Sequence, residues 1–130
     1  MKRPILAKLS AAIVSVGLIA GPALAGGDVE KGKKVFNKCK SCHVADQEKN
    51  KIGPYLVGIF GRSAGTLEGF KYSDAMKGSG IVWSPETLTE YLRKPKDFIP
   101  GNKMTFVGLK KEEQITDLLA YLQEATQKPQ

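Results

Sequence analysis

The apolar positions of the chain repeat at helical spacing in two stretches, one near each end of the sequence. The first follows Asp28, a residue type that favours the N-cap of a helix, and its apolar or small residues recur every three or four positions: Val29, Gly32, Val35, Phe36 and Cys39. The second opens with charged residues at 111–113 and carries a longer stripe: Leu109, Ile115, Leu118, Leu119, Leu122 and Ala125. Because each stripe needs an apolar partner, we predict that two terminal helices pack across each other, with Gly32 allowing their backbones to approach closely.

The residues between these two helices predict little regular structure. Residues 44–73 contain five spaced glycines and no sustained strand alternation, and a loop this long is unusual in a compact domain unless it folds around a bound group. A short helical turn is predicted at 74–77. A further helix is predicted from Ser84 as N-cap, with Pro85 at its first position and its end before Pro95, and residues 95–105 are predicted to be extended or turning. The whole pattern is typical of an all-α domain.

The densest group of reactive side chains is Cys39-Lys40-Ser41-Cys42-His43, which contains both cysteines and the only histidine of the chain. The spacing C-x-x-C-H is typical of a c-type haem attachment site. On a helical turn the three side chains project from one side, so each thiol can form a thioether with a vinyl group while the imidazole reaches the iron. Three alternatives stay open. No further cysteine or histidine is present to complete a structural zinc site, a thioredoxin-like redox pair lacks its βαβ context, and a plain disulfide leaves His43 without a role.

A haem iron held by one histidine has a sixth position, which a thioether, a lysine, water or an exogenous gas could fill. Of the three methionines, the initiator belongs to the N-terminal segment, and Met76 lies in the short helical turn, where a flexible core filler is the ordinary role. Met104 follows a proline–glycine turn in an extended segment and is the preferred ligand. His43 also needs a partner for its other ring nitrogen, and the carbonyl of Pro54 is a candidate.

The first 25 residues differ from the rest of the chain. They combine three early basic residues, an uncharged apolar stretch and the sequence Ala23-Leu24-Ala25, which is typical of a secretory signal peptide cleaved before Gly26. An uncleaved membrane anchor is the alternative, since no charge interrupts residues 9–27. Cleavage of residues 1–25 leaves one domain, residues 26–130, of an exported protein.

Charge and size narrow the classes of partner. The chain has a formal net charge of +7, and removing residues 1–25 lowers it to +4. Nucleic acid is disfavoured as a partner because the chain is predicted to be exported and lacks a basic stripe interleaved with aromatic residues. An acidic protein surface suits this moderate positive charge better. A domain of 105 residues builds only a thin core, which an enclosed haem would enlarge.

Taken in order, these motifs resemble class I cytochrome c, specifically the mitochondrial type and its short relatives exported by respiring and photosynthetic bacteria. The resemblance runs through most of the chain after its first 25 residues: residues 27–36, the C-x-x-C-H motif, Gly53-Pro54, Gly61-Arg62, residues 70–75, Trp83, Tyr91-Leu92, residues 99–104 and residues 118–122. It implies an all-α fold in which the terminal helices cross and long loops wrap around one covalently bound haem.

The resemblance also implies roles for individual residues. Cys39 and Cys42 hold the haem c through two thioethers, and His43 and Met104 bind its iron. Four more residues contact the cofactor: Arg62, Tyr72 and Trp83 around the inner propionate, and Tyr91 near the methionine sulfur. The alternative for the first three is a surface arginine and two core aromatic residues. The lysines that resemble a docking ring around the exposed haem edge are Lys38, Lys40, Lys51, Lys96, Lys103, Lys110 and Lys111.

The function that the resemblance implies is that of a soluble, monomeric one-electron carrier in the bacterial periplasm, not an enzyme and not membrane-spanning once processed. Its partners would be a quinol-cytochrome c reductase and a terminal oxidase, another reductase or a photosynthetic reaction centre with an acidic docking surface. Two departures from the mitochondrial pattern, Asn102 for threonine and Met76 for asparagine, belong to the methionine side of the site. They motivate a rival hypothesis, a haem enzyme or gas sensor with a labile sixth ligand.

Overall fold

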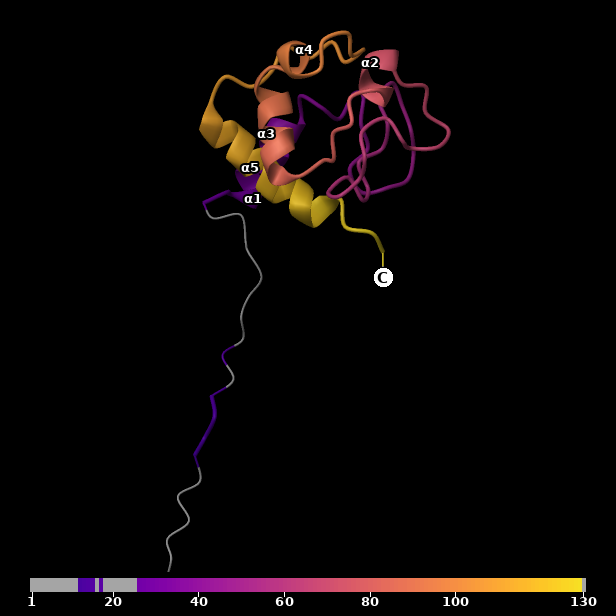
Figure 1. Cartoon of the computed structure of the whole chain (residues 1–130). Coiled ribbons are helices and arrows are strands. Elements are labelled where there is room, and N and C mark those ends of the chain that lie inside the picture. Colours follow the sequence, from indigo (N-terminus) through magenta and orange to yellow (C-terminus); the bar gives the residue numbers. More distant parts are fainter. Residues whose placement is uncertain (1–11, 16, 18–25, 130) are drawn as a thin grey trace, which may run out of the picture.

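The computed structural model describes residues 12–15, 17 and 26–129, and in this part of the chain the regular structure is helical. The helices are α1 (Val29–Phe36), α2 (Asp74–Lys77), α3 (Pro85–Arg93), α4 (Pro95–Phe98) and α5 (Glu112–Ala125) (Figure 1). Within the described residues, β-type pairing is limited to an isolated antiparallel bridge between Ser63 and Val82. The all-α prediction is confirmed.

The two terminal helices pack against each other, as the apolar stripes predicted (Figure 1). Gly32 of α1 is buried at the crossing, where a Cβ atom would overlap the Asp117 carbonyl oxygen and lie 2.8 Å from the Cβ of Tyr121. One turn further on, the rings of Phe36 and Tyr121 lie with their centroids 5.3 Å apart. Asp28 caps α1 by accepting a hydrogen bond from Lys31 N at 2.9 Å, and its own N–H donates to Asp117 Oδ1 of α5, also at 2.9 Å. The missing side chain of Gly32 therefore sets how closely the helices approach.

Helix α1 ends at Phe36, three residues before Cys39, although the apolar spacing that predicts this helix extends to Cys39. Beyond Phe36 the backbone continues as turns with both i→i+3 and i→i+4 bonds, as in the bonds to Phe36 O from Cys39 N (2.8 Å) and from Lys40 N (3.1 Å). The turn continues with Cys42 N donating to Cys39 O at 3.0 Å. Because side chains three residues apart are neighbours on one face of a helical turn, the two cysteines still share one side.

Helix α3 begins where the sequence predicts. Ser84 Oγ accepts from Thr87 N at 3.1 Å, and Ser84 N donates to Thr87 Oγ1 at 2.8 Å, so the two residues form a reciprocal capping box. The face that carries Leu88, Tyr91 and Leu92 is buried, and the helix ends at Arg93. Pro85 stands at the first helical position, where its missing N–H leaves no intrahelical bond unmade.

Residues 95–98 form helix α4, although an extended or turning segment was predicted there. Pro95 closes α3 as expected, but it also begins the new helix, because proline is well suited to a first helical position. Phe98 N donates to Lys94 O at 3.0 Å, and Ile99 N donates to Pro95 O at 3.1 Å. The rest of the segment, from Ile99 to Thr105, is turn and irregular structure, as predicted.

Residues 44–73 form the predicted irregular loop, which is tied to the helices through backbone hydrogen bonds. Gly61 N donates to Trp83 O at 2.7 Å and Trp83 N to Arg62 O at 2.9 Å, beside the isolated bridge. Gly58 N donates to Thr126 O at 2.7 Å, which joins the loop to the residue that follows α5. The loop is thereby fixed without regular structure of its own, with its inner side chains turned to a central cavity.

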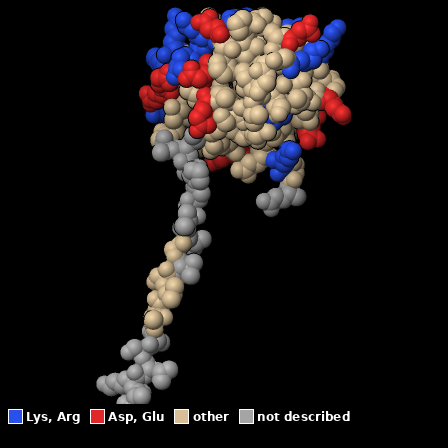
Figure 2. All heavy atoms as spheres, viewed as in Figure 1, with Lys and Arg blue, Asp and Glu red and all other residues tan. Residues whose placement is uncertain are grey.

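Residues 1–11, 16 and 18–25 lie outside the described residues, so the predicted signal peptide at 1–25 stays a prediction. Among the residues that the structure describes, no helix is long and apolar enough to cross a membrane. On the face seen in Figure 2, basic and acidic side chains are interspersed around a stretch of uncharged residues. Neither a positively charged nor a negatively charged patch dominates this view of the domain.

Candidate cofactor-binding site

A cavity of about 450 Å³ lies between the helices and the long loop, and it brings the reactive residues together. Both cysteines, His43 and Met104 line it. Most of the remaining wall is apolar or aromatic and comes from α1, α3, α5 and the loops: Phe36, Leu56, Ile59, Phe70, Leu88, Leu92, Phe106, Leu118 and Leu122. A second, more open hollow of about 840 Å³ contains none of the four reactive residues. The chemistry of the chain is therefore concentrated in the smaller cavity.

The imidazole of His43 is held in one orientation. Its Nδ1 lies 2.7 Å from the carbonyl oxygen of Pro54, and since a carbonyl only accepts, Nδ1 carries the proton and donates. Burial lowers the pKa of His43, so the ring is neutral at pH 7. Gly53 packs against the ring, and a Cβ there would lie 2.8 Å from Nδ1 and 2.9 Å from Nε2. This arrangement leaves Nε2 with its lone pair available to a metal.

The two cysteines are partly buried and are not joined in a disulfide. Burial raises the pKa of Cys39 to about 11, and its neighbour Cys42 adds to the rise, so Cys39 is a neutral thiol at pH 7. In the described part of the chain, no group of three or more histidine, cysteine, aspartate or glutamate residues could hold a metal ion. The zinc alternative therefore gains no support from the described residues.

Met76 and Met104 both line the cavity, and the sulfur of Met104 accepts a hydrogen bond. The backbone N–H of Met104 donates to Asn102 Oδ1 at 2.9 Å, and its Sδ lies 3.7 Å from the hydroxyl of Tyr91, which donates to it. Tyr91 is buried, and burial raises the pKa of its hydroxyl to about 12, so the hydroxyl keeps its proton at pH 7. Gly101 adopts a φ of +88° in the turn before these residues, a conformation that glycine accepts without strain.

Arg62, Tyr72 and Trp83 all line the cavity. The guanidinium of Arg62 donates from Nη1 to Tyr55 O at 3.1 Å and from Nη2 to Val57 O at 2.6 Å, and it lies 5.4 Å from the centre of the Tyr55 ring. Burial raises the pKa of Tyr72, an effect that the nearby positive charge of Arg62 partly opposes. The half-buried guanidinium is therefore placed by loop carbonyls beside the cavity, where it could pair with a buried anion.

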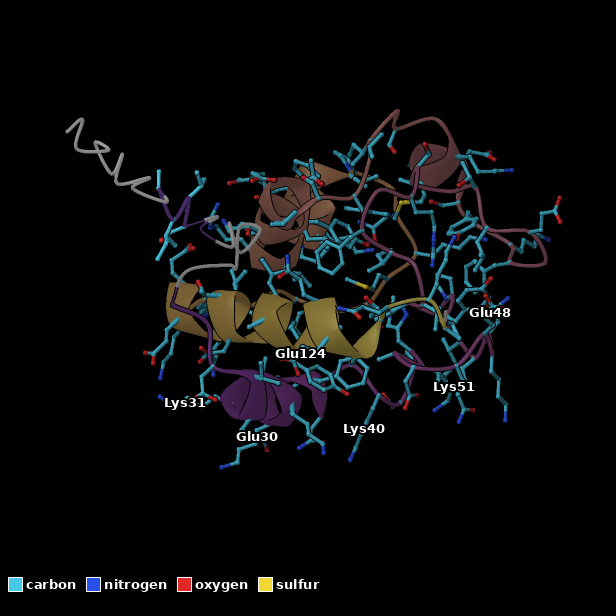
Figure 3. The ribbon with its side chains drawn as sticks, turned by 90° about the horizontal axis from the view of Figure 1, so that it is seen from below. Glu30, Lys31, Lys40, Glu48, Lys51 and Glu124 are labelled. Carbon is cyan, nitrogen blue, oxygen red and sulfur yellow. The ribbon has the colours of Figure 1, made fainter. Side chains whose placement is uncertain are left out.

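The predicted docking lysines are all exposed, but only Lys38 and Lys103 line the cavity. Lys51 Nζ donates to the backbone oxygen of Lys40 at 2.8 Å, and both side chains point away from the domain on the side of α1 (Figure 3). Lys96 Nζ donates to Asn102 O at 2.6 Å. Lys110 and Lys111 directly precede α5. The structure thus separates two lysines at the cavity from five that lie elsewhere on the surface.

Several cavity residues were not identified from the sequence. They lie in segments without periodicity and are aliphatic or aromatic: Ile52, Leu56, Ile59, Phe70 and Phe106. Ile52 is unusual because it lines the cavity and is still 79% exposed. The signal that could have found them is the occurrence of large apolar residues in glycine-rich loops, where no helix or strand of their own explains burial.

The residues present fit a covalently bound haem. Two thiols on one side of a turn, a neutral imidazole with Nε2 available, a thioether held by polar contacts and an apolar wall meet in the same cavity. A half-buried arginine beside this wall suits the carboxylates that such a cofactor carries.

Comparisons with known proteins agree with this site. The family model described as Cytochrome c matches residues 29–126. The chain is 51% identical over 109 residues to cytochrome c type-1 of Ascaris suum, covering 83% of this chain and 97% of that protein. It is 50% identical over 101 residues to cytochrome c2 of Blastochloris viridis, covering 77% and 80%. The solved structure of cytochrome cH from Methylobacterium extorquens is similar with a TM-score of 0.72 and 41% identity, over 75% of this chain and 99% of that one.

Proposed function

The chain belongs to the cytochrome c family, and from that premise we propose that it is a one-electron carrier of the bacterial periplasm whose haem iron is held by His43 and Met104. Members of the family are electron-transfer proteins and not enzymes, and they bind haem c covalently. When bound, the haem supplies an iron that alternates between its ferrous and ferric states and so takes up one electron at a time.

One observation carries the assignment of residues. The cavity that Cys39, Cys42 and His43 line is also lined by Met104, whose N–H and sulfur both have hydrogen-bond partners. We propose that the two cysteines would form the thioethers and that Nε2 of His43 and Sδ of Met104 would bind the iron. A neutral thioether stabilises ferrous iron and raises the reduction potential. An iron held by both His43 and Met104 would leave no coordination site for oxygen or peroxide, which suits a carrier and opposes the enzyme or gas-sensor hypothesis.

The other cavity residues have supporting roles in this proposal. The hydrogen bond from Nδ1 of His43 to Pro54 O fixes the orientation of the ring and raises the basicity of Nε2, which makes this nitrogen a stronger metal ligand. Arg62 is proposed to neutralise the inner propionate together with Tyr72 and Trp83, because a buried carboxylate is costly unless it is paired. Tyr91 is proposed to donate to the methionine sulfur, which reduces the electron density that the sulfur gives to the iron.

The compartment and the partners rest on the sequence. The relatives come from bacteria and from eukaryotes, so the periplasm is inferred from the predicted signal peptide at 1–25. A quinol-cytochrome c reductase is proposed as the electron donor, and a terminal oxidase, another reductase or a photosynthetic reaction centre as the acceptor. The positive charge of the lysines favours acidic docking surfaces, small interfaces and fast, salt-sensitive association. N-terminal sequencing of the exported protein should find Gly26 first; a chain that keeps residues 1–25 would overturn the cleavage and support an anchor.

The ligand assignment is tested with a visible spectrum of the ferric protein at neutral pH. We expect the weak far-red band from sulfur bound to iron in the wild type, its loss in Met104→Ala and its retention in Met76→Leu. Met76 is the matched control because it lines the same cavity. Absence of the band in the wild type, or its loss in Met76→Leu alone, would contradict the assignment.

Docking is tested by the rate of electron transfer to candidate acceptors as the ionic strength changes. Replacing Lys38 or Lys103 with glutamine should slow transfer at low salt more than the same replacement at Lys110, because the first two lysines line the cavity. The difference between these variants should shrink as salt is added. A wild-type rate that rises with ionic strength would show that the partner surface is not acidic.

A further inference from the structure

Asn102 is a buried polar residue, 3% exposed, that lies two residues before Met104. Its Nδ2 donates to Pro95 O and to Ile99 O, each at 2.8 Å, and its Oδ1 accepts from Met104 N at 2.9 Å. The amide orientation follows from these partners, since two carbonyls require donors and one N–H requires an acceptor. Both amide protons and the amide oxygen are therefore paired.

These bonds join the methionine segment to helix α4. Pro95 and Ile99 lie at the two ends of α4, so the amide group of Asn102 spans the helix that precedes the turn. A second connection runs through the main chain, where Asn102 O accepts from Lys96 Nζ, also of α4, at 2.6 Å. Asn102 thus links Met104 on one side to α4 on the other.

The choice of asparagine matters at this position. A threonine hydroxyl has a single proton, so it could keep the bond to the N–H of Met104 but could serve only one of the two α4 carbonyls. Met76, which lines the same cavity, offers only a weak thioether acceptor and no donor. The hydroxyl of Tyr91 lies 3.5 Å from Asn102 Oδ1 and 3.7 Å from Met104 Sδ, so its single proton cannot serve both strongly. The amide of Asn102 is the stronger polar anchor of this segment.

We propose that Asn102 is a positioning residue for the sixth ligand: it holds the Met104 segment against α4 and thereby keeps other ligands from displacing the methionine. This inference rests on the proposed ligation by His43 and Met104. Removing the amide leaves the buried N–H of Met104 and two buried α4 carbonyls without hydrogen-bond partners. This destabilises the closed form, in which the Met104 segment packs against α4, and not the open form, in which water can reach these groups. Opening of the segment should then become roughly tenfold to hundredfold more favourable.

The test is a titration of the exported, haem-loaded ferric protein with imidazole, a small ligand that competes with methionine for the iron. The variants are Asn102→Leu, which is similar in size and apolar, and Asn102→Thr, which keeps one hydroxyl. The control is Thr126→Val, because Thr126 is equally buried and its hydroxyl donates to Leu122 O at 2.6 Å, far along the chain from the methionine segment. Apparent affinity is read from the absorption change, and global stability from guanidinium unfolding.

We expect imidazole to bind Asn102→Leu at least roughly tenfold more tightly than it binds the wild type. The affinity of Asn102→Thr for imidazole should lie between those of Asn102→Leu and the wild type. Thr126→Val should lose global stability without a change in imidazole affinity. A wild-type affinity in Asn102→Leu would overturn the proposal, as would equal effects of leucine and threonine or an equal effect in Thr126→Val. If the wild type itself shows no sulfur-to-iron band, the ligation fails instead, so the two failures are distinguishable.

Discussion

Replacing Gly32 with alanine separates local helix propensity from tertiary packing, because the two predict opposite results. In an isolated helix this change stabilises by about 1 kcal/mol. At the crossing of α1 and α5, however, the new Cβ would overlap the carbonyl oxygen of Asp117 and lie 2.6 Å from its carbonyl carbon. Those atoms belong to the backbone of a helix and cannot turn aside as a side-chain end can, so α1 must move away.

The cost of that movement has two parts. Overpacking in a well-packed core costs about 1–3 kcal/mol. The shift also weakens the hydrogen bond from Asp28 N to Asp117 Oδ1, 2.9 Å long, and a bond to a carboxylate contributes about 1.5–3 kcal/mol. After the propensity gain is subtracted, we expect Gly32→Ala to lower the free energy of unfolding by about 1.5–5 kcal/mol, the upper end applying only if the hydrogen bond is lost completely.

The assay is guanidinium unfolding of the haem-loaded protein followed by far-ultraviolet circular dichroism. With an m value of roughly 3 kcal/mol/M, the midpoint should fall by roughly 1 M. Lys33→Ala is the control, since Lys33 is the next residue of α1 and is exposed, and it should change stability by no more than about 0.5 kcal/mol. A Gly32→Ala protein as stable as the wild type, or more stable, would refute the packing argument and leave propensity as the deciding effect.

Three further predictions concern a cap, an ion pair and the histidine environment. Ser84→Ala removes one half of the capping box of α3 and should lower the free energy of unfolding by about 1 kcal/mol in guanidinium. Arg93 donates to Glu112 Oε1 at 2.6 Å and lowers the pKa of that carboxyl below its ordinary value of 4.5. Arg93→Ala should therefore reduce thermal stability above about pH 4.5, with a difference from the wild type that is lost as the pH falls through the depressed pKa. Gly53→Ala places a methyl group against the His43 ring and should lower the fraction of haem-loaded protein, measured as haem absorbance per protein.

Each of these predictions has a contrary outcome. Ser84→Asp keeps an acceptor for the first turn, so a loss as large as that of Ser84→Ala would mean that capping is not the cause. A stability difference between wild type and Arg93→Ala that is unchanged at pH 3, or unchanged by salt, would exclude the ion pair as its origin. Full haem loading of Gly53→Ala would show that the imidazole tolerates a side chain at 53.

The helices illustrate how far sequence patterns reach. Asp28 and Ser84 begin their helices as predicted because capping depends on a few neighbouring residues. The failures are also local in origin. Pro95 was interpreted only as the end of α3, although proline is equally suited to begin a helix. The apolar periodicity that predicts the first helix extends to Cys39, whereas the helix ends at Phe36 and the backbone continues as hydrogen-bonded turns.

The sequence by itself determined the cofactor class and the terminal crossing. The spacing of Cys39, Cys42 and His43 allows little other chemistry, and two apolar stripes with one buried glycine between them can be satisfied by packing together. These inferences succeed because their evidence is local or periodic. The resemblance to a known family then predicted the whole fold and the role of the segment that carries Met104, which no periodic pattern marks.

Only the tertiary structure decided which partners the loop residues have. The carbonyls that hold Arg62, the return of Asn102 to α4 and the pairing of Lys96 with the methionine segment join residues through turns of irregular backbone. Such contacts leave no repeat in the sequence, because each depends on a single φ and ψ path around the cavity and not on a helical or strand period. The same reason explains why two of the seven predicted docking lysines line the cavity and five do not: exposure can be inferred from charge, but position on the surface cannot.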